Sequence, residues 1–165
     1  MIETERKLII MTPDEDVLRK EASFTKSKIT QIYIEDPIAT HRVRKRVYED
    51  GRTELTENKK VRISKMSSIE DEREITEGEF LSLAEKIEEG AHPLQKIRRT
   101  FEYLGRVIEI DSYSEWESTS VLEVELESED EELRLPDYIR VIADVTGVKM
   151  YSNHSMAHSF PEELI

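Results

Sequence analysis

The stretch MIETERK (residues 1–7) opens the chain and decides how the rest of the sequence is interpreted. In a β-strand, successive side chains point to opposite faces, so Glu3, Glu5 and Lys7 would share one face. Glutamate is a poor strand former, and two like charges on one face repel each other. A solvated strand tolerates such a pair, whereas a face that binds a cation requires it. The other strands of the chain distinguish these two interpretations.

The composition describes a highly charged, acidic protein. Of the 165 residues, 37% are charged and 37% are hydrophobic, and the formal net charge is −13. This length predicts one domain over residues 1–165 that is large enough to bury a core. An acidic surface repels nucleic acid and anionic membranes, so we expect neither as a partner. A polyanionic ligand would therefore need a local concentration of basic side chains that the average composition hides.

The residues that are missing exclude several classes of chemistry. The sequence contains no cysteine, which rules out disulfides, thiolate nucleophiles and thiolate metal sites. No basic and apolar signal region opens the chain, and no apolar run approaches the roughly 18 residues needed to span a bilayer. Together these features predict a cytoplasmic protein.

Alternating apolar and polar residues predict a chain made mainly of strands. The predicted strands cover residues 2–11, 29–35, 40–48, part of 52–64, 72–75, 96–104, 106–113 and 121–127. Helices are predicted to start at Thr12-Pro13, to run from Thr76 to Gly90, to open at Ser128, and to cover 136–143. Most strands follow one another directly, so the predicted fold class is α+β, mainly antiparallel and compatible with a closed barrel.

Pairs of like charge occupy one face of strand after strand, opposite an apolar face. The acidic pairs are Glu3/Glu5, Glu72/Glu74, Glu109/Asp111 and Glu123/Glu125. The basic sets are Arg42/Arg44/Arg46, Lys60/Arg62 and Lys96/Arg98. An ordinary solvated face mixes polar residues and sets opposite charges across strands, because like charges there are destabilising.

The segregation of charge by strand predicts charged faces that point inward around a water-filled lumen. Two unit charges about 4 Å apart interact by on the order of 4 kcal/mol at an effective dielectric of about 20, so such clusters are costly without ligands. Basic sets suit phosphates, and acidic pairs suit Mg²⁺ or Mn²⁺, which prefer oxygen ligands. His154 and His158 also have the spacing of a metal pair on a helix, but no third ligand lies near them in the sequence, so no zinc site is predicted.

These motifs together resemble the CYTH domain, the family of triphosphate tunnel metalloenzymes. Residues 3–7 (ETERK) match the family's ExExK signature, and residues 42–44 (RVR) resemble its RxR strand. The segments EREI, KIR, IEID and LEVEL follow in the family's order, and DVTGVKMYSN resembles its closing motif EVTGDxRYxN. The resemblance covers essentially the whole chain. It implies an eight-stranded antiparallel β-barrel with flanking helices that binds a triphosphate and Mg²⁺ or Mn²⁺ inside.

The resemblance also implies roles for individual residues. The implied metal ligands are Glu3, Glu5, Glu123 and Glu125. The implied phosphate-binding residues are Lys7, Arg42, Arg44, Lys60, Lys96 and Arg98. The family's TxK strand has no clear match in this sequence, so Arg62 is an alternative to Lys60 for the basic residue of that strand. The implied wall carboxylates are Glu72, Glu74, Glu109 and Asp111. Catalysis is expected to depend on Glu5, Glu125 and Lys7 in particular.

The predicted activity is hydrolysis of a phosphoanhydride bond, with inorganic triphosphate as the first candidate substrate because no pocket for an organic group is recognisable. Thiamine triphosphate and nucleoside triphosphates remain alternatives, as does a class IV-type adenylyl cyclase, which the same family contains. A different class of function is a non-catalytic polyphosphate- or nucleotide-binding module, although simple anion binding would not require acidic pairs. A small-molecule triphosphate is the expected partner, and the sequence leaves a homodimer open.

Overall fold

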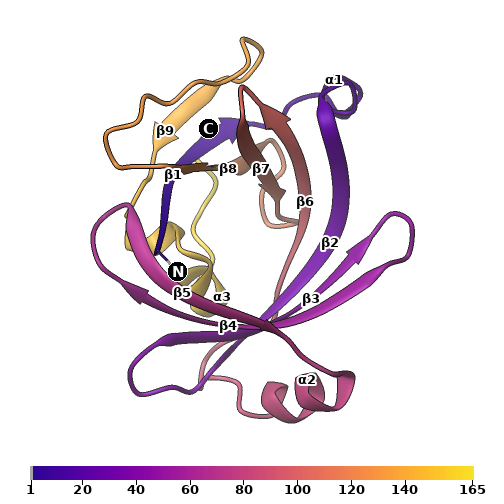
Figure 1. Ribbon diagram of the computed structural model, residues 1–165, viewed down its shortest axis with the longest axis vertical. Helices are drawn as coiled ribbons and strands as arrows, with labels where there is room; N and C mark the ends of the chain where they lie inside the picture. The colour runs from indigo at the N-terminus through magenta and orange to yellow at the C-terminus, as the bar shows by residue number, and fades with distance from the viewer. Residues whose placement is uncertain (1) are drawn as a thin grey trace.

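The computed structural model describes residues 2–165, and its architecture is a ring of β-strands with short helices around it (Figure 1). The strands are β1 (Ile2–Met11), β2 (Ala22–Ile34), β3 (Thr40–Tyr48), β4 (Thr53–Arg62), β5 (Ser67–Glu74), β6 (Leu94–Tyr103), β7 (Arg106–Ser112), β8 (Thr119–Leu126) and β9 (Val141–Asp144). The helices are α1 (Glu15–Leu18), α2 (Glu77–Ala84), the 3₁₀ turn η1 (Lys149–Tyr151) and α3 (Asn153–His158). No helix within 2–165 is long and apolar enough to cross a membrane.

Eight strands close into a barrel in the order β5-β4-β3-β2-β6-β7-β8-β1, and every neighbouring pair is antiparallel. Closure is made by the first residues of β1, where Ile2 pairs with Ile69 and Thr4 with Ser67 of β5. The ninth strand, β9, pairs with the later part of β1, so both halves of β1 have a partner on that side. Closure removes the open strand edges that invite aggregation. The predicted eight-stranded antiparallel barrel with flanking helices is confirmed, with one extra strand.

The hydrophobic core lies largely outside the barrel because the outward faces of the strands are apolar. Leu8 and Ile10 point outward from β1 and pack with Leu122, Val124 and further residues of β7 and β8. The segment 127–140, together with α1, covers this face, as the orange segment beside β1 and β8 in Figure 1 shows. On the far side, α2 lies outside β3 and β4 and packs over a second cluster around Val43.

One end of the barrel interior is filled by a third, partly aromatic cluster. Ile9 shares the inward face of β1 with the charged residues that precede it, and it packs with Val121, which lies directly opposite on β8. Tyr113, Trp116 and Tyr151 complete this plug: the ring of Trp116 meets Tyr113 edge-on and Tyr151 at a tilt. The interior is therefore charged along part of its length and apolar at one end.

Two predicted helix starts are wrong because their capping side chains have other partners. Thr12 does not cap a helix: its hydroxyl bonds to Ser120 at 2.7 Å, and α1 starts later, with Asp14 as N-cap. Ser128 opens no helix, because the Glu131 carboxylate that should complete its capping box accepts hydrogen bonds from the Arg106 guanidinium instead. The Thr76–Glu79 capping box of α2, in contrast, is confirmed.

The predicted helix over 136–143 is also wrong. Only one turn forms there, closed by the bond from Ile139 N to Pro136 O, and the chain then extends into β9. An ion pair between Arg6 and Asp144 helps to hold this strand against β1. Tertiary pairing with an otherwise open edge outweighs helix propensity here. Strands β2 and β5 also begin several residues before their predicted starts.

Candidate active site

The charged faces of the strands enclose a cavity of about 830 Å³ inside the barrel. Its acidic lining residues are Glu3, Glu5, Glu70, Asp71, Glu72, Glu109, Glu123 and Glu125. Its basic lining residues are Lys7, Arg42, Arg44, Arg46, Lys60, Arg62, Lys65, Arg98 and Lys149. Nine of the chain's 24 lysines and arginines therefore gather in one cavity, although the chain as a whole is strongly acidic.

The acidic side of the cavity sets carboxylates directly opposite one another on neighbouring strands. Glu5 of β1 faces Glu125 of β8, and Glu109 of β7 faces Glu123 of β8. Like charges in directly opposed positions destabilise a sheet. A divalent cation would relieve this repulsion, and carboxylate oxygens are the ligands that Mg²⁺ and Mn²⁺ prefer.

Two carboxylates on the acidic side, Glu3 and Glu5, have raised pKa values, which is a further sign of crowded negative charge. A hydrogen bond shared with Glu70, together with burial, raises the pKa of Glu3 to about 9. Burial, followed by repulsion from Glu123, raises the pKa of Glu5 to about 7. At neutral pH this cluster therefore retains protons, which a metal ion would displace because metal ligands bind deprotonated. The chemistry of this donor set fits a hard divalent cation.

Lys7 and Glu123 form a charged pair between the acidic cluster and the apolar plug. Lys7 Nζ lies 3.4 Å from Glu123 Oε1 and donates to the Tyr151 carbonyl at 3.2 Å. Burial acts to raise the pKa of Glu123, but the positive charges of Lys7, Lys96 and Arg98 together outweigh it and lower this pKa to about 2. Burial likewise acts to lower the pKa of Lys7, and the attraction of Glu123 and Glu5 reverses the sign. Both groups are therefore charged at neutral pH.

Two arginines on the basic side of the cavity have side-chain donors without hydrogen-bond acceptors. The Nε atoms of Arg42 and Arg44 are buried, and neither has a hydrogen-bond partner among the described residues. One Nη of Arg44 donates to Gln31 Oε1 at 2.9 Å, and Arg42 makes a long ion pair, 3.8 Å, with Glu72. Burial, then repulsion from Arg42 and Arg98, lowers the pKa of Arg44 to about 9. Buried, crowded guanidinium groups with unused donors suit a phosphate, which arginine binds through two parallel hydrogen bonds.

Arg98 belongs to a buried ionic network in the wall at β6 and β7. Its guanidinium binds both oxygens of Asp111, at 2.8 and 2.9 Å, and Glu109 at 2.9 Å. Lys96 Nζ lies 2.8 Å from Asp111 in the same network, and its side chain is 0% exposed. Burial lowers the pKa of Lys96 to about 7. Arg98 lines the cavity, whereas Lys96 and Asp111 do not, so a direct contact of Lys96 with phosphate would require it to leave Asp111.

Most of the remaining predicted site residues also line the cavity. Lys60 faces Glu70 across β4 and β5, and Arg62 lies near the exposed rim. Glu72 lines the cavity, but Glu74, at the end of β5, is exposed and lies outside its lining. The predicted roles of these residues remain predictions.

Sequence reasoning missed several lining residues, of which Glu70 matters most. It accepts a hydrogen bond from Asn58 at 3.2 Å and shares one with Glu3. The short predicted strand over 72–75 left Glu70 out, although it has the same parity as Glu72 and would have joined its face in a longer strand. Lys65, between β4 and β5, and Lys149, at the start of η1, carry no periodic signal that could have identified them.

The barrel and its two-signed cavity define the class of this protein: the chain has the CYTH-like triphosphate tunnel fold, as the sequence resemblance implied. Among solved structures, the chain is similar to the inorganic triphosphatase NE1496, with a TM-score of 0.58 and 26% identity over 96% of each chain. It also shares its fold with the PH1819 protein from Pyrococcus horikoshii OT3, with a TM-score of 0.58 and 20% identity over 76% of this chain and 80% of that one. No family model and no curated protein matches the sequence.

Proposed function

We propose that this protein is a divalent-metal-dependent triphosphatase that hydrolyses inorganic triphosphate to pyrophosphate and phosphate inside the barrel. The observation that carries the proposal is the juxtaposition of unpartnered buried Nε atoms on Arg42 and Arg44 with proton-retaining carboxylates on β1. A metal–triphosphate complex would supply acceptors for these guanidinium donors and a cation for these carboxylates. The similarity to the inorganic triphosphatase NE1496 supports the same substrate class.

The metal ion would be held by carboxylates of β1 and β8, namely Glu3, Glu5, Glu123 and Glu125 as the sequence predicts. Glu70 joins this set in our proposal because it already shares a proton with Glu3. When bound, Mg²⁺ or Mn²⁺ would act as a Lewis acid on phosphate oxygens. The carboxylates themselves bind and orient the cation and lose their protons to solvent as they do so.

The phosphate chain would be held by the guanidinium groups of Arg42, Arg44 and Arg98 and by the ammonium groups of Lys7 and Lys60. Arginine forks position phosphate oxygens, and lysines add point charge. Charge neutralisation and in-line positioning are the main requirements of phosphoryl transfer. The proposed reaction is direct attack by water on a terminal phosphorus. A P–O bond to the water oxygen forms as the bridging P–O bond breaks, pyrophosphate leaves, and the water oxygen remains on the released phosphate, whose proton goes to solvent.

The lining favours an inorganic substrate over an organic one. Most of the lining residues are charged, and Tyr33 and His154 are the aromatic rings among them. An adenine or thiazole ring is normally recognised by apolar or aromatic surfaces with a few placed polar groups. Such a surface is poorly represented in this lining.

The test is phosphate release from a matched panel of inorganic triphosphate, ATP, GTP, thiamine triphosphate and pyrophosphate, each with Mg²⁺, with Mn²⁺ or with chelator. We expect preference for inorganic triphosphate, dependence on metal, and loss of turnover in Glu125→Gln. Glu127→Gln, two residues further along and exposed, is the matched control and should turn over normally. Preference for an organic triphosphate, or cyclic AMP formed from ATP, would refute the substrate assignment. Binding of triphosphate without turnover would indicate a binding module.

A further inference from the structure

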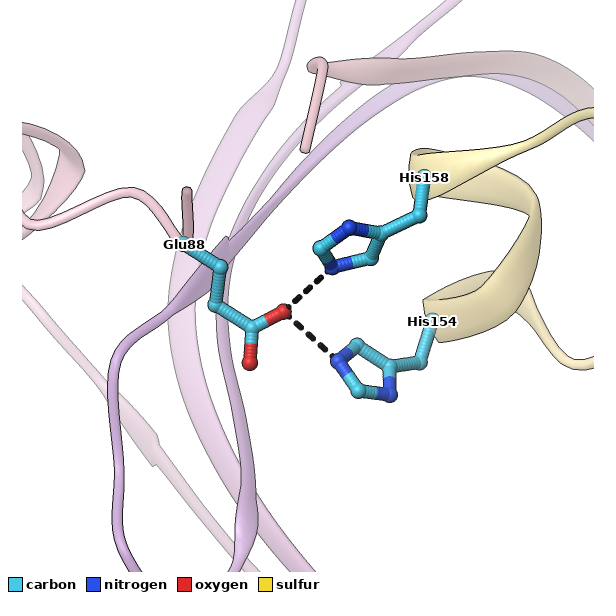
Figure 2. Close-up of side chains that lie close together, drawn as sticks. All are labelled: Glu88, His154 and His158. Atoms are coloured by element: carbon cyan, nitrogen blue, oxygen red, sulfur yellow. Dashed lines mark hydrogen bonds and ion pairs between the residues drawn. The ribbon is translucent and has the colours of Figure 1, made fainter. Parts of the chain in front are cut away.

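A second group of metal-ligating side chains lies where α3 meets the segment that follows α2. Figure 2 shows His154 and His158 of α3 pointing toward the carboxylate of Glu88. Each histidine Nε2 lies within hydrogen-bond distance of the same oxygen, Glu88 Oε1, at 2.6 Å for His154 and 2.8 Å for His158. One potential ligand atom from each residue lies within 4.8 Å of the other two.

The backbone holds these three side chains in place from two directions. On α3, the spacing of four residues sets both imidazoles on one helix face, with ring centroids 5.4 Å apart. Opposite them, Glu88 N donates to the Tyr33 carbonyl at 2.9 Å, which fixes the segment to β2. His92 N donates to the Ala157 carbonyl at 2.8 Å, which ties the same segment to α3.

The donor set is chemically different from the carboxylate cluster in the barrel. Two imidazoles and one carboxylate suit Zn²⁺ and its neighbours in the first transition series, whereas Mg²⁺ prefers oxygen ligands alone. Three protein ligands also leave a fourth position for water, as in open zinc sites. The groups are partly exposed, with side-chain exposures of 35%, 35% and 20% for His154, His158 and Glu88, so an ion from solution can reach them.

The geometry needs only a small adjustment to accept such an ion. Ligand atoms about 2.05 Å from a tetrahedral Zn²⁺ lie about 3.3 Å from one another. The two nitrogen–oxygen distances of 2.6 and 2.8 Å must therefore widen by about 0.7 and about 0.5 Å, within the reach of side-chain rotation. Both imidazoles would then present lone pairs at Nε2 in place of protons.

We propose that Glu88, His154 and His158 form a binding site for a divalent transition-metal ion of the Zn²⁺ type, completed by one water molecule. The ion would clamp α3 to the segment after α2. This site is separate in its ligands from the proposed magnesium-type site, and the proposal does not rest on the proposed activity. Because His154 also lines the barrel cavity, the clamp lies at the boundary of that cavity.

The competing explanation is a purely hydrogen-bonded cluster, in which both imidazoles donate Nε2–H to Glu88. The two explanations differ in what happens when zinc is offered to the protein. A hydrogen-bonded cluster alone binds no ion, whereas the proposed site binds one per chain, with both imidazoles carrying their N–H proton at Nδ1 and leaving Nε2 to the ion.

The experiment is a calorimetric titration of tag-free protein with Zn²⁺ in excess Mg²⁺, which saturates all-oxygen sites. A parallel titration with Co²⁺ reads the site directly, because four-coordinate cobalt with imidazole ligands absorbs intensely in the visible range and six-coordinate cobalt with oxygen ligands does not. We compare the wild type with His158→Gln and Glu88→Gln, which keep hydrogen-bonding side chains on two different segments. His92→Gln is the matched control, because His92 is exposed and its hydrogen bond to α3 is made by the backbone N, which the substitution keeps.

We expect one Zn²⁺ per wild-type chain and the intense cobalt spectrum in wild type and His92→Gln. Either ligand variant should weaken zinc binding by at least about 100-fold, since changing even a group behind a ligand costs 10–100-fold. Zinc should also raise the melting temperature of the wild type and not that of the ligand variants. The proposal would be overturned if the wild type bound no zinc, or if His158→Gln and Glu88→Gln bound zinc as tightly as the wild type.

Discussion

Glu5→Gln should make the metal-free protein more stable at alkaline pH, although the same change should abolish turnover. The carboxyl group of Glu5 has a pKa raised from 4.5 to about 7, first by burial and then by repulsion from Glu123. The folded state therefore holds a proton that the unfolded state releases at lower pH. The stability that this group contributes is fully present below pH 4.5 and is lost as the pH rises through 7. Glutamine mimics the protonated form at every pH.

The magnitude follows from the shift in pKa. A rise of about 2.5 in pKa, at about 1.4 kcal/mol for each pKa unit, corresponds to about 3.5 kcal/mol, and solvent screening of a partly buried carboxylate reduces this to about 2 kcal/mol. At pH 9 in chelator, Glu5→Gln should therefore exceed the wild type by about 2 kcal/mol in free energy of unfolding. For a chain of this size that corresponds to a melting temperature about 6 °C higher. At pH 4.5 the two proteins should be nearly equal.

The assay is urea unfolding followed through the fluorescence of Trp116, repeated from pH 4.5 to 9 with chelator and again with Mg²⁺. Glu102→Gln, an exposed change on β6, serves as control and should shift little at any pH. Added Mg²⁺ should stabilise the wild type and remove the advantage of Glu5→Gln, because the ion compensates the carboxylates only where they remain. Equal or lower stability of Glu5→Gln at pH 9 in chelator would refute the conclusion that this cluster is electrostatically strained.

Three further substitutions test, in turn, a phosphate-binding residue, a buried ion pair in the barrel wall and a residue of the outer hydrophobic core. Arg44→Ala should raise the KM for triphosphate by about 10- to 100-fold, since hydrogen bonds to charged groups contribute about 1.5–3 kcal/mol, and steady-state kinetics would show this; an unchanged KM would remove Arg44 from the phosphate site. Lys96→Met should cost about 3 kcal/mol of stability by breaking the buried pair with Asp111, yet leave triphosphate affinity unchanged in calorimetry; weakened binding in a folded variant would show that Lys96 reaches the substrate. Leu122→Ala should cost about 2–5 kcal/mol in denaturant unfolding while the folded fraction keeps its turnover, because this fully buried side chain points away from the cavity; a large loss of specific activity would contradict that separation.

The barrel was predictable because its strands carry a strong two-residue period. In β3, for example, Arg42 and Arg44 alternate with Val43, and the predicted bounds of this strand match the structure. The charged pairs also indicated which face would be enclosed. Turns such as Asp50-Gly51 marked strand ends through local chemistry that does not depend on tertiary structure.

The failures arose where distant contacts decide the outcome. Glu131 could have capped a helix, but Arg106, 25 residues away, binds its carboxylate. Residues 141–144 form a strand because they pair with β1, and this tertiary contact outweighs the helix propensity of the segment. Glu88 lies 66 and 70 residues from the two histidines that it contacts, so a search for neighbouring ligands could not find this cluster.

The position of the hydrophobic core outside the barrel has a consequence for how this molecule tolerates change. In β3 and β4, one set of side chains packs against the outer layer and the alternate set lines the cavity, so residues that stabilise the fold alternate with residues that can contact a ligand. Changes of size or charge on the inward set leave the outer packing layers untouched. A library that randomises only inward positions on β3 and β4 should therefore yield mostly folded proteins with altered anion preference, which makes the barrel a practical starting point for redesign.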